Sequence, residues 1–235
     1  MSQLNNQSSG PETTNQQSDS HITQPKSTKR APLWVAPVAA LLFGVIYAIL
    51  PERITLGPSW LPLVVEVIVI LPGAIAHLMQ HPFTQHTNRI GSFILLSIIT
   101  IALAIGVVLL VVTLPQRQQG LQAISLLRTG VLLYISNILV FALWYWEIDG
   151  NGAHERFQTG HKAADLLFPQ QADGNSTGWV PHFFDYLFVA FTASTALSPT
   201  DTFPLTRRAK ILFIIQASIA ITILSIIIGR AINIV

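Results

Sequence analysis

The sequence predicts an all-α integral membrane protein with five transmembrane helices and a re-entrant half-helix before the last of them. Composition is the first reason, because 51% of the residues are hydrophobic and 10% are charged, whereas soluble domains carry about 25% charged residues. The mean hydropathy is +0.53. The second reason is that apolar runs near the roughly 20 residues that cross a bilayer core recur along the chain.

Residues 1–33 differ from the rest of the chain, since they are rich in Ser, Thr, Gln and Asn. Such a composition predicts a disordered tail. The tail lacks the apolar core of a signal peptide, so we expect the first spanning helix to act as the insertion signal. The absence of Cys excludes disulfides, thiolate metal sites and Cys nucleophiles. The net charge of +2 gives no indication of a nucleic-acid partner.

Residues 34–148 are expected to form a region of four transmembrane helices. Proline, polar or aromatic residues bound each apolar run, and Trp34, Trp60 and Trp144 lie near run ends, where aromatic rings favour the membrane interface. The expected spans of this region, and the last span of the chain, are residues 34–50, 60–79, 93–114, 124–146 and 211–232.

Residues 149–180 are polar and predict a loop, within which residues 163–168 predict a short interfacial turn. Residues 181–235 then hold a half-helix and the last span. The run PHFFDYLFVAFTASTAL is too short to cross a membrane, and Pro199 cannot extend a helix. We therefore expect a half-helix from Asp185 to about Leu197, after which residues 198–201 return the chain to the surface from which it entered.

The segment DYLFVAFTASTALSPTDTFPLTRRAKILFIIQASIAI resembles the pore-helix, filter and inner-helix pattern of potassium-channel-type pore domains. Asp185 matches the start of the pore helix, and Asp201 matches the acid at the end of the filter. The resemblance implies a homo-oligomer, a tetramer if it is a channel, that passes monovalent cations. It also implies a set of pore-lining or filter-like residues, namely Thr192, Thr195, Ser198, Thr200 and Asp201.

The sequence departs from that pattern in the filter. A potassium filter aims successive carbonyls at one axis, which requires glycines that adopt positive φ. Leu197 and Pro199 stand at the corresponding places. Proline is locked near about −65°, and leucine meets a steric penalty at positive φ. We therefore expect a weakly selective lining of side chains rather than a ladder of carbonyls.

A second resemblance covers more of the chain. The motif WYWE-x-D-G-x-G, at residues 144–152, and the stretch FPQ, at residues 168–170, resemble an uncharacterised family of bacterial multi-pass membrane proteins. That resemblance implies a location in the bacterial inner membrane and brings no established activity.

Three acidic residues are further candidates. Glu66 lies inside the second expected span, where a charge facing lipid is costly. It either couples to protons or cations, or extends toward the headgroups from its place shortly after Trp60. Glu147 and Asp149 either form an acidic mouth beside the half-helix or end the fourth span in water, and the second reading is favoured for Asp149 because Gly150 follows it.

We expect no cofactor and no metal. His77, His81 and His86 are separated by Pro82, which ends a helix, and no carboxylate lies near them in sequence. The sequence shows no phosphate-binding glycine loop and no nucleophile elbow, so no catalytic residues are assigned.

Lys and Arg are more numerous on the side of the N-terminal tail, which favours a cytoplasmic N-terminus. The leading hypothesis is a polytopic membrane protein with an ion-channel-like pore-loop module that passes cations with weak selectivity. The alternative is a non-conducting scaffold or partner-binding protein with a structural re-entrant segment. A weaker alternative is a membrane enzyme that uses the loop of residues 149–180.

Overall fold

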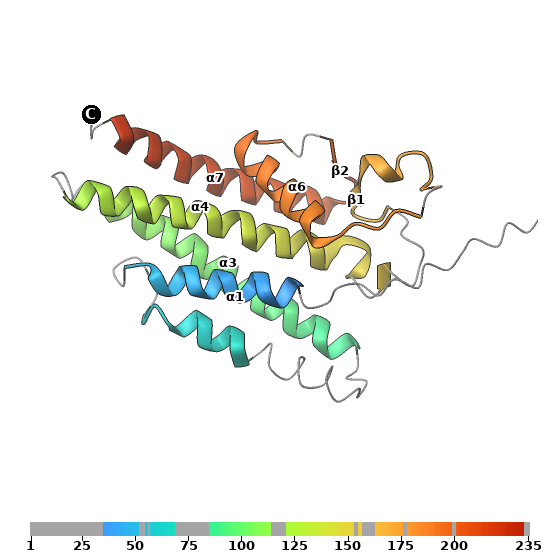
Figure 1. The fold of residues 1–235 in the computed structure, drawn as a ribbon, viewed down its shortest axis with the longest axis horizontal. Helices are drawn as coiled ribbons and strands as arrows, with labels where there is room; N and C mark the ends of the chain where they lie inside the picture. The colour runs from blue at the N-terminus through green and yellow to red at the C-terminus, as the bar shows by residue number, and fades with distance from the viewer. Residues whose placement is uncertain are drawn as a thin grey trace, which may run out of the picture.

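The computed structural model describes residues 35–51, 55, 57–68, 85–113, 121–152, 155–156, 163–175, 178–198 and 201–232, and the expected N-terminal tail lies outside them. The described part is mostly helical, as predicted (Figure 1). In chain order its elements are α1 (Val35–Ile49), α3 (Gln85–Thr113), α4 (Leu121–Ile148), η3 (Asp149–Asn151), β1 (Leu166–Leu167), η4 (Pro169–Gln171), α6 (Phe183–Thr195), β2 (Phe203–Pro204) and α7 (Arg207–Ile232).

Three helices, α3, α4 and α7, are long and apolar enough to cross a membrane. They correspond to the third, fourth and fifth expected spans. Helix α1 covers the first expected span, but its 15 residues fall short of the roughly 20 that a span needs. Of the second, residues 61–68 are helical and residues 69–84 lie outside the described part of the chain. The count of five spans is therefore not confirmed.

All three long helices start earlier than predicted, and polar residues extend α3 and α7. Helix α3 begins at Gln85, and Arg89 in its polar first turns donates to the Asn151 side chain at 3.0 Å. Helix α7 begins at Arg207, because the Thr206 hydroxyl accepts the Ala209 amide at 3.4 Å. A threonine in that place caps a helix N-terminus. Hydropathy detects only the apolar part of such helices.

Helix α4 is the centre of the bundle. It packs against α1, α3, α6 and α7, and it is the most buried of the three long helices. In Figure 1, α6 and α7 lie on one side of α4 and α1 lies on the other, while α3 contacts both α4 and α7. Its core side chains, all fully buried, include Leu133, Val140, Phe141 and Tyr145.

A two-stranded ribbon departs from the all-α prediction. Strand β1 pairs antiparallel with β2, so that Leu166 lies opposite Pro204 and Leu167 opposite Phe203. The expectation of a turn over residues 163–168 is thus wrong, because β2 supplies a pairing partner from beyond α6. The ribbon joins the chain before α6 to the chain after it.

Candidate functional site

Helix α6 starts beside the C-terminal end of α4. The Trp146 ring of α4 meets the rings of Phe183 and Tyr186 edge-on, with centroids 5.9 and 5.5 Å away. The His182 amide donates to the Asp185 carboxylate at 2.6 Å, which places an acid in the first turn, where the helix dipole favours it. The helix begins two residues before the predicted Asp185, because His182 is the N-cap.

The last turns of α6 contact the middle of α4 and α7 through buried polar groups. The Gln216 side-chain amide of α7 donates to the Ala190 carbonyl at 2.7 Å and to the Ser194 hydroxyl at 2.8 Å. The Asn137 amide of α4 donates to the same hydroxyl at 3.2 Å. The Tyr145 hydroxyl donates to the Gln216 side-chain oxygen at 2.5 Å. We call Asn137, Tyr145, Ser194 and Gln216 the mid-helix cluster.

The mid-helix cluster gives the depth that α6 reaches. Asn137 lies about three turns before the end of α4, or roughly 16 Å along its axis. Gln216 lies about two and a half turns into α7, or roughly 14 Å. A bilayer core is about 30 Å thick. Helix α6 therefore extends along about half the length of a membrane-spanning helix and stops.

The end of α6 uses a left-handed residue. The helix ends at Thr195, the Ala196 amide donates to the Thr192 carbonyl at 2.8 Å, and Leu197 has a φ of 54°. A left-handed residue directly after the C-cap is a common helix stop, and glycine is usual there. A leucine costs about 1–2 kcal/mol in this conformation. Leu197 therefore adopts a positive φ, although the steric penalty for leucine predicted that it would not.

The chain then returns to the end of α4. The Leu205 amide donates to the Asp165 carbonyl at 2.8 Å, and the Arg208 guanidinium forms an ion pair with the Asp165 carboxylate and donates to the Ile148 carbonyl at 3.2 Å. Burial works against ionisation of Asp165, but hydrogen bonds from Arg208 and Thr206 outweigh it and hold the pKa of this carboxyl below its ordinary value. Entry to α6 and exit from it are therefore fastened at the same end of the bundle.

Asp149 fastens this end, contrary to the favoured reading that it ends the fourth span in water. Its side chain is 3% exposed and accepts the amides of Asp165 and Leu166 at 3.0 and 3.2 Å and the Tyr186 hydroxyl at 2.7 Å. Gly150, beside it, has a φ of 55°, a conformation that L side chains rarely adopt. Asp149 thus connects α4 both to the ribbon and to α6, rather than lining an open acidic mouth.

The motif at residues 144–152 also holds a buried arginine. The Arg156 guanidinium donates to the Trp146 carbonyl at 2.7 Å and to the Asp149 carbonyl. It lies over the rings of Trp146 and Tyr186, 4.8 and 5.1 Å from their centroids. These contacts place a positive charge against aromatic faces, which attract it. The WYWE-x-D-G-x-G motif is thus the packing surface for the start of α6.

The residues that the channel resemblance singles out divide into two groups. Thr192 is buried, and its hydroxyl donates to carbonyls of its own helix. Thr195, Ser198 and Asp201 are exposed around the turn that follows α6. Thr200 lies outside the described residues. The structure therefore leaves three of the five exposed at or after the end of α6 and places Thr192 inside the bundle.

The other acidic candidates lie apart from this turn. Glu66 is fully buried within the bundle, beside α1. Glu147 is half-buried at the end of α4, where it interacts electrostatically with Arg89 and Arg156. Among the described residues, no group of three or more His, Asp or Glu side chains is placed to hold a metal.

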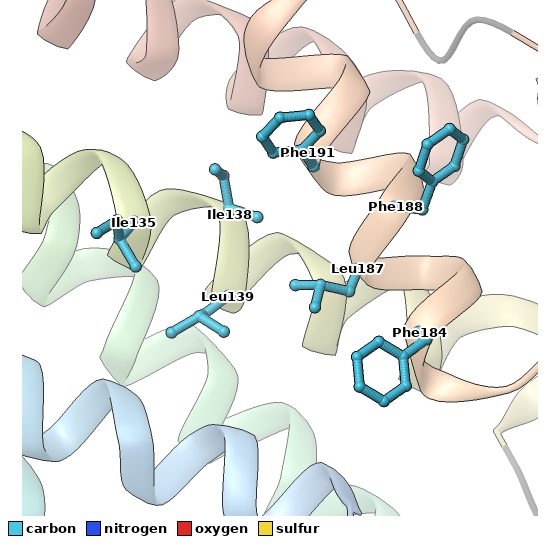
Figure 2. Close-up of a pocket in the computed structure, with 7 residues that line it drawn as sticks. All are labelled: Ile135, Ile138, Leu139, Phe184, Leu187, Phe188 and Phe191. Carbon is cyan, nitrogen blue, oxygen red and sulfur yellow. The ribbon is translucent and has the colours of Figure 1, made fainter.

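An apolar groove of about 410 Å³ lies between α4 and α6. Figure 2 shows that α4 and α6 both contribute to it, and its lining is entirely hydrocarbon. Such a groove accommodates hydrocarbon and offers no group for catalysis. Its lining residues are Ile135, Ile138, Leu139, Phe184, Leu187, Phe188 and Phe191.

Sequence reasoning missed Gln216, Ser194, Asp165 and Arg156. A single signal was available for Gln216, since an amide inside an apolar span must find a partner. Ser194 is one of several hydroxyl residues in its segment, and nothing in the sequence separates it from them.

No protein-family model matches this sequence, and neither a curated protein nor a solved structure matches it significantly.

Proposed function

We propose that the chain is a polytopic membrane protein whose residues 181–232 form a pore-loop module, and that several copies surround a path for monovalent cations. The observation that carries the proposal is the place of the turn after α6. Residues 195–198 are exposed at the depth of the mid-helix cluster, about halfway along the long helices. This place agrees with the resemblance of residues 185–221 to potassium-channel-type pore domains.

A turn at that depth needs a polar neighbour. The last carbonyls of a helix have no partner within the helix, and lipid offers none, so irregular backbone at membrane depth must face protein or water. A symmetric homo-oligomer would supply both, because it gathers the same turn from each copy around one axis. A tetramer is the arrangement that the channel resemblance implies.

The charges around the turn favour cations. The C-terminal end of a helix carries about half a negative charge, and that end of α6 is exposed at the turn. Asp201 is exposed on the return path and adds a carboxylate. If each copy placed its α6 C-terminal end and its Asp201 carboxylate around one axis, these negative groups would stabilise a partly dehydrated cation there.

Selectivity is expected to be weak. A potassium filter needs a run of carbonyls on one axis, whereas Leu197 is the only residue with positive φ in the described stretch 183–198. The remaining ligands near the turn are the side chains of Thr195, Ser198 and Asp201. Hydroxyl and carboxylate groups on side chains hold a cation less rigidly than a ladder of carbonyls.

One observation favours a non-conducting alternative. The mid-helix cluster and Asp149 fasten α6 firmly to α4 and α7, which is also what a structural re-entrant segment in a scaffold or partner-binding protein requires. A bacterial inner-membrane location, a cytoplasmic N-terminus and kinship with the uncharacterised multi-pass family belong to the proposal in either form.

Flux through liposomes tests the proposal. Purified protein is reconstituted, and Na⁺ and K⁺ fluxes are compared for the natural chain, Asp201→Asn and Asp173→Asn. Asp173 is an exposed acid in the loop before α6 and serves as the matched control. We expect flux of both cations, lowered several-fold by Asp201→Asn and unchanged by Asp173→Asn. Flux no greater than that of protein-free liposomes would favour the scaffold.

A further inference from the structure

A second site lies away from α6, between α1 and the helical residues 61–68. The Glu66 side chain is 0% exposed, and neither of its carboxylate oxygens has a hydrogen-bond partner in the part of the chain that the structure describes. The backbone of Gly44 in α1 approaches this carboxyl without completing a hydrogen bond. A carboxyl that is both buried and unpartnered is unusual, because buried polar groups are nearly always paired.

Gly44 makes the space that the carboxyl occupies. A Cβ atom at Gly44 would lie 2.2 Å from Glu66 Oε2 and 2.8 Å from Leu63 Cδ1, closer than real Cβ atoms approach any neighbour. Every side chain other than hydrogen would therefore displace the carboxyl. Helix α1 thus has a notch at the one position where the acid of the neighbouring helix enters it.

The outer surface near the notch is apolar. Leu42 and Val45 flank Gly44 on α1, Val64 and Val67 flank Glu66, and all four are exposed on the outer surface of the bundle. Glu66 follows the exposed Trp60 by about 9 Å along the helix axis. If Trp60 lies at the interface, as its ring favours, the carboxyl lies beneath a surface that contacts acyl chains.

Among the residues that the structure describes, no neighbouring charge compensates an ionised Glu66. The only other titratable side chain of α1 and residues 61–68 is that of Tyr47, and the described groups include no cation that interacts with the carboxyl. An uncompensated carboxylate removed from water costs several kcal/mol or more, and the group avoids this cost when it binds a proton.

We propose that Glu66 is a membrane-buried proton-binding site that reacts, in its acid form, with hydrophobic carbodiimides. In that reaction the carboxylic acid adds across one C=N bond: its proton moves to the nitrogen and its oxygen bonds to the central carbon. Transfer of the acyl group to nitrogen then gives a stable N-acylurea. The addition requires the protonated acid and no further reagent, and it is independent of the proposed cation path.

Intact-mass measurement after treatment with dicyclohexylcarbodiimide in lipid vesicles tests the proposal. We expect one adduct per chain, which is absent in Glu66→Gln and retained in Glu147→Gln, the half-buried acid beside Arg89 and Arg156. A water-soluble carbodiimide should give no adduct. In the natural chain, labelling should slow as pH rises and fall about tenfold per pH unit once the acid ionises, a readout that does not depend on any variant folding.

Any of three labelling results would overturn the assignment. They are the absence of an adduct at mildly acidic pH, an adduct that persists in Glu66→Gln, and equal labelling by the water-soluble reagent. Protection by sodium or lithium salts, with choline salts of equal ionic strength giving none, would identify a site for metal cations and would likewise contradict a site for protons alone.

Discussion

The Gln216 side-chain amide donates to the Ser194 hydroxyl at 2.8 Å and thereby joins the middle of α7 to the last turn of α6. The same amide donates to the Ala190 carbonyl, and its oxygen accepts the Tyr145 hydroxyl. All of these groups are buried, so water cannot replace a lost partner. The depth at which α6 stops is therefore held largely by one side chain.

Gln216→Leu should lower the free energy of unfolding by about 1–2 kcal/mol, since interhelical hydrogen bonds in membranes contribute roughly 0.6–1.7 kcal/mol each. Unfolding in mixed detergent micelles, followed by circular dichroism, measures the change. Ser218→Ala is the control, because Ser218 is exposed on α7 and bonds only to its own helix. Equal stability of the two variants would show that the mid-helix cluster does not hold α6.

The Asp165–Arg208 ion pair should make stability depend on pH. Because the pKa of Asp165 is lower in the folded chain than in the unfolded chain, its contribution is present above the unfolded value of about 3.9 and is lost as pH falls through the folded value. Asp165→Asn should therefore be less stable at neutral pH and should lose less stability on acidification. Melting temperatures across this range provide the measurement, and Asp173→Asn should behave like the natural chain.

Leu197→Gly should raise stability by roughly 1 kcal/mol, because it removes the steric cost of positive φ. The matched control is Leu205→Gly. The two leucines are 49% and 46% exposed, but φ is positive only at Leu197. Glycine at position 205 should therefore lower stability, because it increases the conformational entropy of the unfolded chain without relieving any strain. Thermal unfolding of both variants decides this, and a loss of stability in each would contradict the left-handed turn. Leu197→Gly should not by itself create potassium selectivity.

Hydropathy located the long helices because lipid-like runs are a local property of sequence. The fourth expected span, 124–146, lies within α4, and the fifth, 211–232, lies within α7. Their true ends depend on capping groups such as the Thr206 hydroxyl, which hydropathy does not detect. The short apolar run at α6 also distinguished it from the spanning helices, because a helix of 13 residues is too short to cross a bilayer.

Long-range partners could not be predicted in the same way. Asp149 looked like a solvated helix end, because its three hydrogen-bond donors lie 16 to 37 residues further along the chain. The β1–β2 ribbon could not be predicted for the same reason, because the partner of β1 is β2, which follows α6 in the chain. One sequence without relatives shows which groups need partners, but not where those partners lie.

The orientation in the membrane can be tested with single cysteines, because the chain has none of its own. Gly10→Cys and Gly160→Cys should both resist a membrane-impermeant maleimide added from outside intact cells and react after permeabilisation. The excess of Lys and Arg on the side of the N-terminal tail is the reason. Labelling of both positions from outside would reverse the proposed orientation.

The central claim is that the turns after α6 from several copies meet at one axis, and a Leu197→Cys chain tests it most directly. Disulfides require Cα atoms within about 7 Å of one another. Mild oxidation in native membranes should therefore convert most Leu197→Cys chains to disulfide-linked dimers, whereas Val108→Cys, on the exposed face of α3, should remain monomeric. Leu197→Cys chains that stay monomeric after oxidation, in membranes where the protein is folded, would contradict the claim.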